Sequence, residues 1–340
     1  MNRILVVRLG SLGDIVHAIP AVAALRSQWP HAQLDWATSP VYRDLVAMVD
    51  GVDHVVPVDT RALFGSSGLL TAIGRLRASR YDAVLDLQGL LKSAVLARLA
   101  GGQRTLGYAR PDLREPAAAA FYSHATDVSE AGHVIDKALR LMRAIGCKTS
   151  DRRFPISVPD IPEVTALAKR LSSSGYALLN PGAAWPNKRW PVDKYGVVAA
   201  RLKVERGMTS VVLWGPGERA RAEAVVAASE GAAEVAPPTT IPAIAALAQQ
   251  ARLIVSGDTG PLQLALAVGT PAVALFGPTR AERNGPWASQ DISISRVDRC
   301  ECVHVRQCRR SESCINTIGV DEALSAVATR LDRAGAEGPG

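Results

Sequence analysis

Short apolar runs alternate with amphipathic stretches along most of the chain, a pattern typical of helices layered on parallel sheets. The apolar runs predict strands buried on both faces, because they show no alternation between apolar and polar residues. In the first half, the predicted strands are residues 4–9, 34–37, 55–58, 83–87 and 104–106. The helices predicted there from their spacing are residues 15–26, 116–122 and 133–145.

The same alternation starts again after a proline-containing stretch at residues 154–162, which predicts a linker between two domains. In the second half, the predicted strands are residues 176–179, 210–213, 253–256 and 272–276. The predicted helices are residues 163–172, 192–205, 219–229, 241–250, 261–268 and 321–331. We therefore predict an α/β chain with two Rossmann-like, doubly wound domains facing a cleft, residues 1–158 and 159–340. Sugar transferases of the GT-B architecture share this plan with other α/β proteins, so it fixes no chemistry.

Composition agrees with two folded domains. The chain has 340 residues, 48% of them hydrophobic and 21% charged, which excludes a disordered chain. Its net charge of +7 is spread over both halves, but basic residues outnumber acidic ones in the segment 61–115. That segment is either a solvated surface or a face for an anionic partner, such as a phosphorylated lipid or a nucleic acid.

The sequence predicts neither a membrane-spanning helix nor a signal peptide. The longest uncharged run, residues 259–279, is interrupted by Gly269 and Pro271. The apolar run between Arg3 and Arg8 is too short for a secretory signal. We therefore expect a cytoplasmic protein, in which five cysteines argue against a disulfide framework.

The first strand ends in Gly-Ser-Leu-Gly-Asp at residues 10–14. This loop is not a dinucleotide fingerprint, because it lacks the third glycine and no acidic residue closes the next strand. Two interpretations of Asp14 stay open. It either caps the helix that follows, or projects from the carboxyl end of the strand as a general base.

Loops that follow three predicted strands of the second domain suggest a nucleotide site. The helix that begins after Asp258 and Thr259 offers backbone N–H groups to a diphosphate, although either side chain could instead cap the helix. Lys188 is either a phosphate ligand or an ordinary exposed lysine. Glu218 either accepts hydrogen bonds from ribose hydroxyls or complements a helix dipole.

The segment 299–315 is rich in cysteine, with the spacing C-x-C-x5-C-x5-C. Such a set suits a tetrahedral zinc or iron site, although the first spacer is shorter than usual and His304 could replace one ligand. The alternative is free or paired thiols in a surface loop. The candidate metal ligands are Cys300, Cys302, Cys308 and Cys314.

Taken together, several motifs resemble the heptosyltransferase family of glycosyltransferases, family 9, which builds the inner core of lipopolysaccharide from ADP-heptose. The motifs are RLGSLGD at 8–14, DLQGLLKSA at 86–94, REPAA at 114–118, NPGA at 180–183 with KRWP at 188–191, DTG at 258–260 and FGPT at 276–279. GLLKSA and REPAA look most like the heptosyltransferase I branch, which adds the first heptose to a Kdo-bearing lipid A. The resemblance implies a GT-B fold.

The resemblance also implies site residues. Asp14 matches the family's catalytic base, Lys188 the lysine that holds the donor diphosphate, and Glu218 the ribose ligand. The implied donor-binding residues are Ala183, Ala184, Lys188, Glu218, Asp258, Thr259, Gly260 and Gln263. The implied acceptor-binding residues are Ser11, Lys92, Arg114, His133 and Lys137. The chain departs from the family at Gln263, where a histidine is usual, and at Ala183 and Ala184, where hydroxyl side chains can contact the donor.

We therefore expect an inverting transferase that needs no cofactor, takes ADP-heptose as donor and uses an anionic, lipid-linked Kdo acceptor. It would make transient contact with the inner face of the inner membrane. One rival uses the same donor on a later core heptose or a protein hydroxyl. Another is a nucleic-acid-binding protein with a four-cysteine ribbon, which the even spread of charge disfavours, so no nucleic-acid partner is expected. A third is a catalytically inactive sugar-nucleotide sensor.

Overall fold

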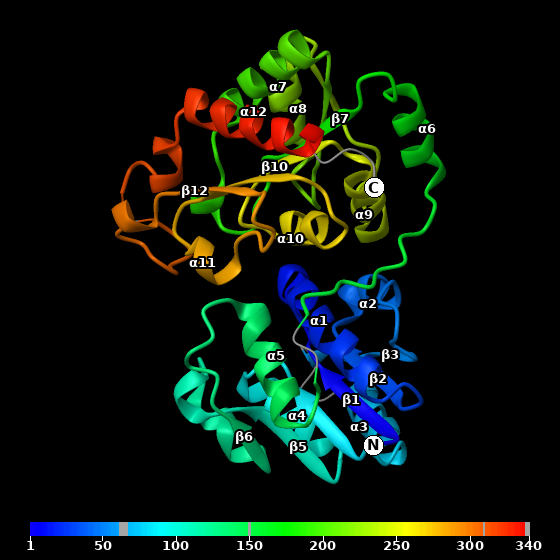
Figure 1. Ribbon diagram of the computed structural model, residues 1–340. Coiled ribbons are helices and arrows are strands. Elements are labelled where there is room, and N and C mark those ends of the chain that lie inside the picture. The colour runs from blue at the N-terminus through cyan, green and yellow to red at the C-terminus, as the bar shows by residue number, and fades with distance from the viewer. Residues whose placement is uncertain (61–66, 149–150, 309, 337–340) are drawn as a thin grey trace. The chain divides into compact units, whose positions relative to one another are not determined.

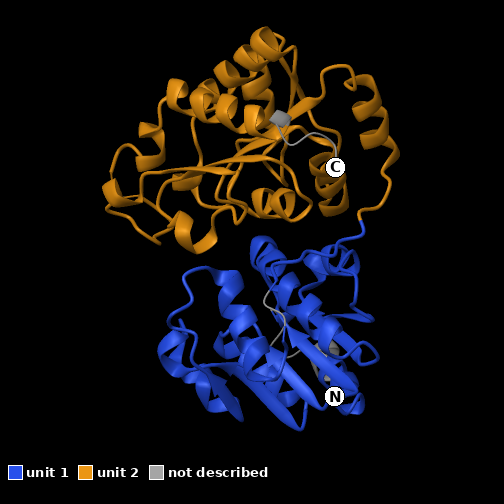
Figure 2. Ribbon diagram, in the orientation of Figure 1, with its two compact units in different colours: residues 1–157 blue, residues 158–340 orange. Residues whose placement is uncertain are grey.

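The computed structural model describes residues 1–60, 67–148, 151–308 and 310–336. The chain divides into two compact units, residues 1–157 and 158–340, shown in different colours in Figure 2. The sequence places the domain boundary at residues 158 and 159, inside its predicted linker. The start of the basic segment, residues 61–66, and residue 309 of the cysteine-rich segment lie outside the described residues.

Unit 1 contains a 6-stranded parallel sheet with the order β3-β2-β1-β4-β5-β6. The strands are β1 (Arg3–Val7), β2 (Gln33–Thr38), β3 (His54–Pro57), β4 (Ala83–Asp86), β5 (Arg104–Tyr108) and β6 (His124–Thr126). The α-helices are α1 (Leu12–Gln28), α2 (Arg43–Ala47), α3 (Ser67–Ala78), α4 (Leu91–Leu99) and α5 (Val134–Ala144). Short 3-10 helices are η1 (Pro40–Tyr42), η3 (Arg110–Asp112) and η4 (Pro116–Phe121).

Helices cover both faces of this sheet, which explains why its central strand has no polar side. Ile4, Leu5, Val6 and Val7 of β1 are all at most 1% exposed. Leu5 and Val7 belong to a core that also includes side chains of α3 and α4. Helices α1 and α5 pack against each other (Figure 1). The continuous apolar run predicted as a buried strand is confirmed.

Unit 2 repeats the plan with the order β12-β11-β10-β7-β8-β9. Its strands are β7 (Tyr176–Asn180), β8 (Thr209–Val212), β9 (Ala233–Val235), β10 (Leu253–Gly257), β11 (Ala272–Phe276) and β12 (Ile292–Ser295). Its α-helices are α6 (Pro162–Arg170), α7 (Val192–Arg206), α8 (Arg219–Ala227), α9 (Ile241–Gln250), α10 (Gly260–Ala267), α11 (Ala281–Asn284) and α12 (Val320–Ala336). Its 3-10 helices are η5 (Pro186–Lys188), η6 (Val297–Arg299) and η7 (Cys314–Thr317). Helices α7, α8 and α12 lie on one side of the sheet and α9 and α10 on the other (Figure 1).

Both sheets follow the doubly wound order in which the first and fourth strands of each unit are neighbours. The direction of winding reverses there, and ligands of such sheets bind outside the carboxyl ends of the strands at that switch point. In unit 1 the switch point lies between β1 and β4, and in unit 2 between β7 and β10. The α/β, doubly wound prediction is therefore confirmed.

The sequence missed three strands and gave one helix the wrong type. Strands β6, β9 and β12 lie at sheet edges and are only three or four residues long. Each includes polar residues, so they lack the apolar run of a central strand. Residues 116–122, predicted as a helix with α spacing, form the 3-10 helix η4 instead. In the described part of the chain, we find no helix that is both long and apolar enough to cross a bilayer.

Candidate functional site

Asp14 lies at the switch point of unit 1, in the first turn of α1. Ser11 holds the N-cap position of this helix, and its backbone N–H and hydroxyl donate to Asp14 Oδ2 at 3.0 and 2.9 Å. The prediction that Asp14 is the N-cap is therefore wrong. Asp14 lies in the first turn, where its carboxylate completes a capping box by accepting from the backbone N–H of the N-cap residue Ser11. The side chain is still 45% exposed. Because an ionised carboxylate has about four acceptor sites, a substrate hydroxyl can still donate to it.

Arg8 fixes the other oxygen of that carboxylate. Its Nη2 lies 2.8 Å from Asp14 Oδ1, and its Nη1 donates to the carbonyl oxygen of Leu87, just after β4. The guanidinium thus spans the two strands that meet at the switch point. Desolvation opposes ionisation of Asp14, but the charge of Arg8 and the hydrogen bonds from Ser11 outweigh it and lower its pKa. Asp14 is consequently ionised at neutral pH, as a general base must be.

Asp86 is a positioning residue that sequence reasoning did not identify. Its side chain is fully buried at the end of β4, where burial raises its pKa even though it accepts several hydrogen bonds. The donors are Gln88 N at 2.8 Å, Gly89 N at 3.2 Å, Ser93 Oγ at 2.9 Å and Tyr122 Oη at 2.7 Å. Asp86 thereby holds the loop whose Leu87 carbonyl anchors Arg8. The signal was its place at the end of an apolar run.

The implied acceptor-binding residues occupy different environments in unit 1. Lys92 is exposed in the first turn of α4, Arg114 is exposed between η3 and η4, and Lys137 is half-buried on α5. His133 is only 7% exposed and caps α5, because its Nδ1 accepts from the backbone N–H of Ile135. Its ring also meets the ring of His17, a residue of α1, with 5.7 Å between centroids. Ser11 is the member of the implied set that hydrogen-bonds to Asp14.

Lys188 and Asp258 meet at the switch point of unit 2. Lys188 Nζ lies 2.6 Å from Asp258 Oδ2 and 4.8 Å from the ring centroid of Trp185. The same oxygen, Oδ2, accepts from Thr279 Oγ1 at 2.8 Å and Asn284 Nδ2 at 3.3 Å. With side chains 15% and 7% exposed, the lysine and the aspartate are largely withdrawn from water. Lys188 is therefore not an ordinary surface lysine.

The start of α10 offers fewer donors than its sequence suggested. Thr259 is the N-cap, and its hydroxyl accepts from the backbone N–H of Leu262 at 3.4 Å. The N–H of Gln263 bonds to the carbonyl of Thr259, and Pro261 has no N–H. The N–H of Gly260 is thus the first-turn donor best placed to take a ligand. A phosphate at this helix start would be held by that N–H and by Lys188 rather than by a full turn of backbone.

The carboxylate of Glu218 lies against the loop that follows β7. A Cβ on Gly182 would collide with the Glu218 carboxylate, so only glycine leaves room for it. Glu218 also accepts from the N–H of Gly215 at 3.3 Å, and Arg189 Nη2 lies 3.9 Å from its other oxygen. Glu218 follows β8 in the chain and thus contacts the loop that follows the neighbouring strand β7. Ala183 beside it is buried, whereas Ala184 is exposed.

Gln263 points into the interior of unit 2. Its side chain is 2% exposed, and its Nε2 donates to the carbonyl of Asn284 at 2.7 Å. Asn284 in turn donates to Asp258. The geometry therefore makes Gln263 a support for the Asp258 cluster, and its role as a donor-binding residue stays a prediction.

In the described part of the cysteine-rich segment, the structure does not support the four-cysteine metal centre that the spacing allowed. Among the described residues, no group of three or more His, Cys, Asp and Glu side chains is arranged to hold a metal. The chain turns at residues 301–304, so Cys302 meets Cys308 with 3.1 Å between sulfurs, while Cys314 is hydrogen-bonded with Cys300. Burial raises the pKa of Cys314 to about 12. The closest contacts among these four free cysteines thus join them in two pairs, and Cys308 also interacts electrostatically with Cys300 and Cys314 across the pairs.

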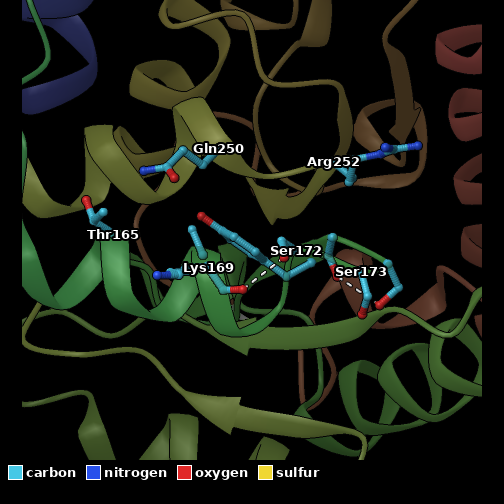
Figure 3. Close-up of a pocket in the computed structure, with 10 residues that line it drawn as sticks. Thr165, Lys169, Ser172, Ser173, Gln250 and Arg252 are labelled. Atoms are coloured by element: carbon cyan, nitrogen blue, oxygen red, sulfur yellow. Dashed lines mark hydrogen bonds between the residues drawn. The ribbon is translucent and has the colours of Figure 1, made fainter.

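A cavity of roughly 650 Å³ lies at the other end of the second sheet, beside the amino-terminal end of β7. Figure 3 shows that the charged ends of Lys169 and Arg252, both in its lining, point away from each other. Its basic groups therefore do not converge on one ligand atom. Two candidate sites remain, one at the switch point of each unit: Arg8 and Asp14 in unit 1, and Lys188, Glu218 and residues 258–260 in unit 2.

Comparison with known proteins gives consistent matches. Residues 70–314 match the model of glycosyltransferase family 9 (heptosyltransferase). Lipopolysaccharide heptosyltransferase 1 of Pseudomonas aeruginosa is 32% identical over 307 residues, which cover 88% of this chain and 85% of that protein. A family 9 glycosyltransferase of Veillonella parvula has a similar structure, with a TM-score of 0.84, 22% identity and 98% of both chains covered. Escherichia coli heptosyltransferase WaaC with ADP-2-deoxy-2-fluoro heptose gives a TM-score of 0.76 at 23% identity, over 96% of this chain and 99% of that one.

Proposed function

The chain belongs to glycosyltransferase family 9, the heptosyltransferases, and we propose that it transfers heptose from ADP-heptose to a Kdo residue of lipid A in lipopolysaccharide core synthesis. One observation carries the proposal. Each unit presents complementary chemistry at its own switch point, an ionised carboxylate on Asp14 and a lysine on the diphosphate-binding loops. A sensor of sugar nucleotides would need only the second of these.

The proposed reaction is a single displacement that inverts the anomeric carbon. Asp14 takes the proton of an acceptor hydroxyl while that oxygen bonds to the anomeric carbon of the heptose. The bond from that carbon to the diphosphate breaks, and ADP leaves with the electron pair. Lys188 and the N–H of Gly260 stabilise the negative charge that develops on the diphosphate. Because these groups supply the charge, we expect chelation by EDTA to leave turnover unchanged.

We further propose that the donor is bound by unit 2 and the acceptor by unit 1. The exposed cations Lys92 and Arg114, with half-buried Lys137, suit the phosphates and carboxylates of a Kdo-bearing lipid. Such a surface would also attract the anionic face of a membrane, which supports a transient contact there. The choice of donor is supported by the E. coli relative WaaC, whose structure holds a fluorinated ADP-heptose.

The decisive experiment offers ADP-heptose together with a panel of acceptors and follows the products by mass spectrometry. Mass gain on Kdo–lipid A, with none on an already heptosylated core or on protein, is the expected result. Transfer to a later core heptose or to a protein hydroxyl would redirect the acceptor assignment. An absence of transfer with every acceptor, despite donor binding, would favour a sensor.

We expect Arg8 to determine how far kcat/KM is maintained as the pH falls. Since the pKa of Asp14 lies below its usual value of 3.8, wild-type kcat/KM should hold through mildly acidic pH and fall only as Asp14 is protonated. In Arg8→Gln, desolvation remains but the cation is gone, so the acid limb should move to higher pH. The pH profiles of both proteins test this, with Arg43→Gln on the surface of α2 as a matched control. Overlapping acid limbs for wild type and Arg8→Gln would contradict it.

A further inference from the structure

The cysteine-rich loop is part of the wall of the candidate site in unit 2. The backbone N–H of His304 donates to the carbonyl of Pro278, in the loop after β11, at 2.8 Å. Asn187, the neighbour of Lys188 in η5, donates through Nδ2 to the carbonyl of Val305, also at 2.8 Å. Residues 304 and 305 are thus tied to both loops that flank the Lys188–Asp258 pair.

His304 has an unusual backbone for a residue with a side chain. Its φ is 60°, in the left-handed region, which it shares among described non-glycine residues only with Arg80 and Glu230. This conformation is disfavoured when a Cβ is present, and such residues cluster where a side chain must be aimed at a ligand. Glycine would adopt this conformation freely, so the imidazole is present here at a conformational cost.

The side chain of His304 shares the electrostatic environment of the diphosphate-binding groups. The residue is exposed, and desolvation together with the charges of Arg283, Arg280 and Lys188 lowers the pKa of its imidazole, while Asp258 acts in the opposite direction. These residues are therefore its charged neighbours. A neutral imidazole still has one N–H to donate, and in this cationic surrounding it adds a directed hydrogen bond without a further charge.

The thiol pairs explain how an exposed loop keeps this position. Cys302, only 3% exposed, contacts Cys308 at 3.1 Å and so closes the loop that carries His304. Arg306 in the same loop donates through Nη2 to the carbonyl of Ala184 at 3.3 Å, which ties the loop to the segment after β7. The cysteine-rich segment thus supports a wall of the candidate site in unit 2.

We propose that His304 is a donor-binding residue, whose imidazole N–H donates to the terminal phosphate of a nucleoside diphosphate held by Lys188. The proposal rests on the proposed function and extends it, because it assigns to the cysteine-rich loop the recognition of the second phosphate. It distinguishes nucleoside diphosphates from monophosphates, since a monophosphate has no group at that position.

Binding of ADP and AMP to the whole protein, measured by isothermal titration calorimetry, tests this assignment. His304→Gly removes the imidazole and retains the left-handed backbone, and it should weaken ADP about tenfold while leaving AMP unchanged. His304→Asn keeps an N–H donor and tolerates the same φ, so it should recover much of the ADP affinity. Glu230→Gly, at another left-handed position of unit 2, is the matched control and should bind ADP like the wild type.

Equal losses of ADP and AMP affinity in His304→Gly would mean that the residue only shapes the loop, and would overturn the proposal. Unchanged ADP affinity would overturn it as well, while leaving the proposed function intact. If the wild-type protein bound no adenine nucleotide, the proposed function itself would fail, and the role of His304 with it. The comparison of wild type with variant therefore separates the two failures.

Discussion

Asp14→Asn should reduce the turnover number by about 10²- to 10⁴-fold, the usual contribution of a general base. Asparagine at this position still offers an oxygen to the Ser11 N–H, so the first turn of α1 should persist. Affinity for ADP should stay at the wild-type level, because every proposed donor contact belongs to unit 2. Steady-state kinetics with saturating acceptor, together with ADP titrations, measure the two effects separately.

Two further variants show whether the loss is chemical. Arg43→Gln, on the exposed surface of α2, leaves this carboxylate and its partners in place, so turnover should stay at the wild-type level. Asp14→Glu keeps a carboxylate but places it one methylene group farther from the backbone. A displacement of that size should still cost much of the rate. Turnover of Asp14→Asn within a few-fold of wild type would remove Asp14 from the catalytic role.

The sequence could predict which loops contain candidate site residues. A strand buried on both faces is recognisable as an apolar run, and the loop at its carboxyl end follows directly in the sequence. Asp14, Lys188 and Asp258 were predicted as site residues in this way, and the structure places all three in loops or first helical turns that follow such strands. Their partners were not predicted. Lys188 and Asp258 belong to loops 70 residues apart. They meet because β7 and β10 are neighbours across the switch point, and neighbouring strands are not consecutive in the chain.

Other differences arise where packing decides the direction of a side chain. Gln263 follows a donor loop, but the helix turns it inward to Asn284, which no local pattern records. The spacing of the cysteines allowed a tetrahedral site, whereas the turn after Cys300 sorts them into two pairs. Asp86 was not predicted as a positioning residue, because the sequence does not show that its carboxylate is buried. An aspartate at the end of a strand predicts an exposed ligand, yet its partner Tyr122 follows η4 and helps to bury it.

Lys188→Met should have two large effects, one on stability and one on binding. Asp258 would keep its bonds from Thr279 and Asn284 but lose its counter-charge, and removal of one partner of a buried pair costs about 3–5 kcal/mol of the free energy of unfolding. Affinity for ADP should fall at least tenfold, because hydrogen bonds to charged groups contribute about 1.5–3 kcal/mol. Urea unfolding and calorimetric titration with ADP measure these effects.

The double variant Lys188→Met with Asp258→Asn separates the two roles of the lysine. Asparagine retains an oxygen for Thr279 and Asn284 without a charge, so most of the lost stability should return. ADP affinity should remain low, because the cation that holds the diphosphate is still absent. Recovery of ADP binding in the double variant would mean that Lys188 only neutralises Asp258. In that case the diphosphate would be held by other groups at this edge, and the helix start at Gly260 would be the first to examine.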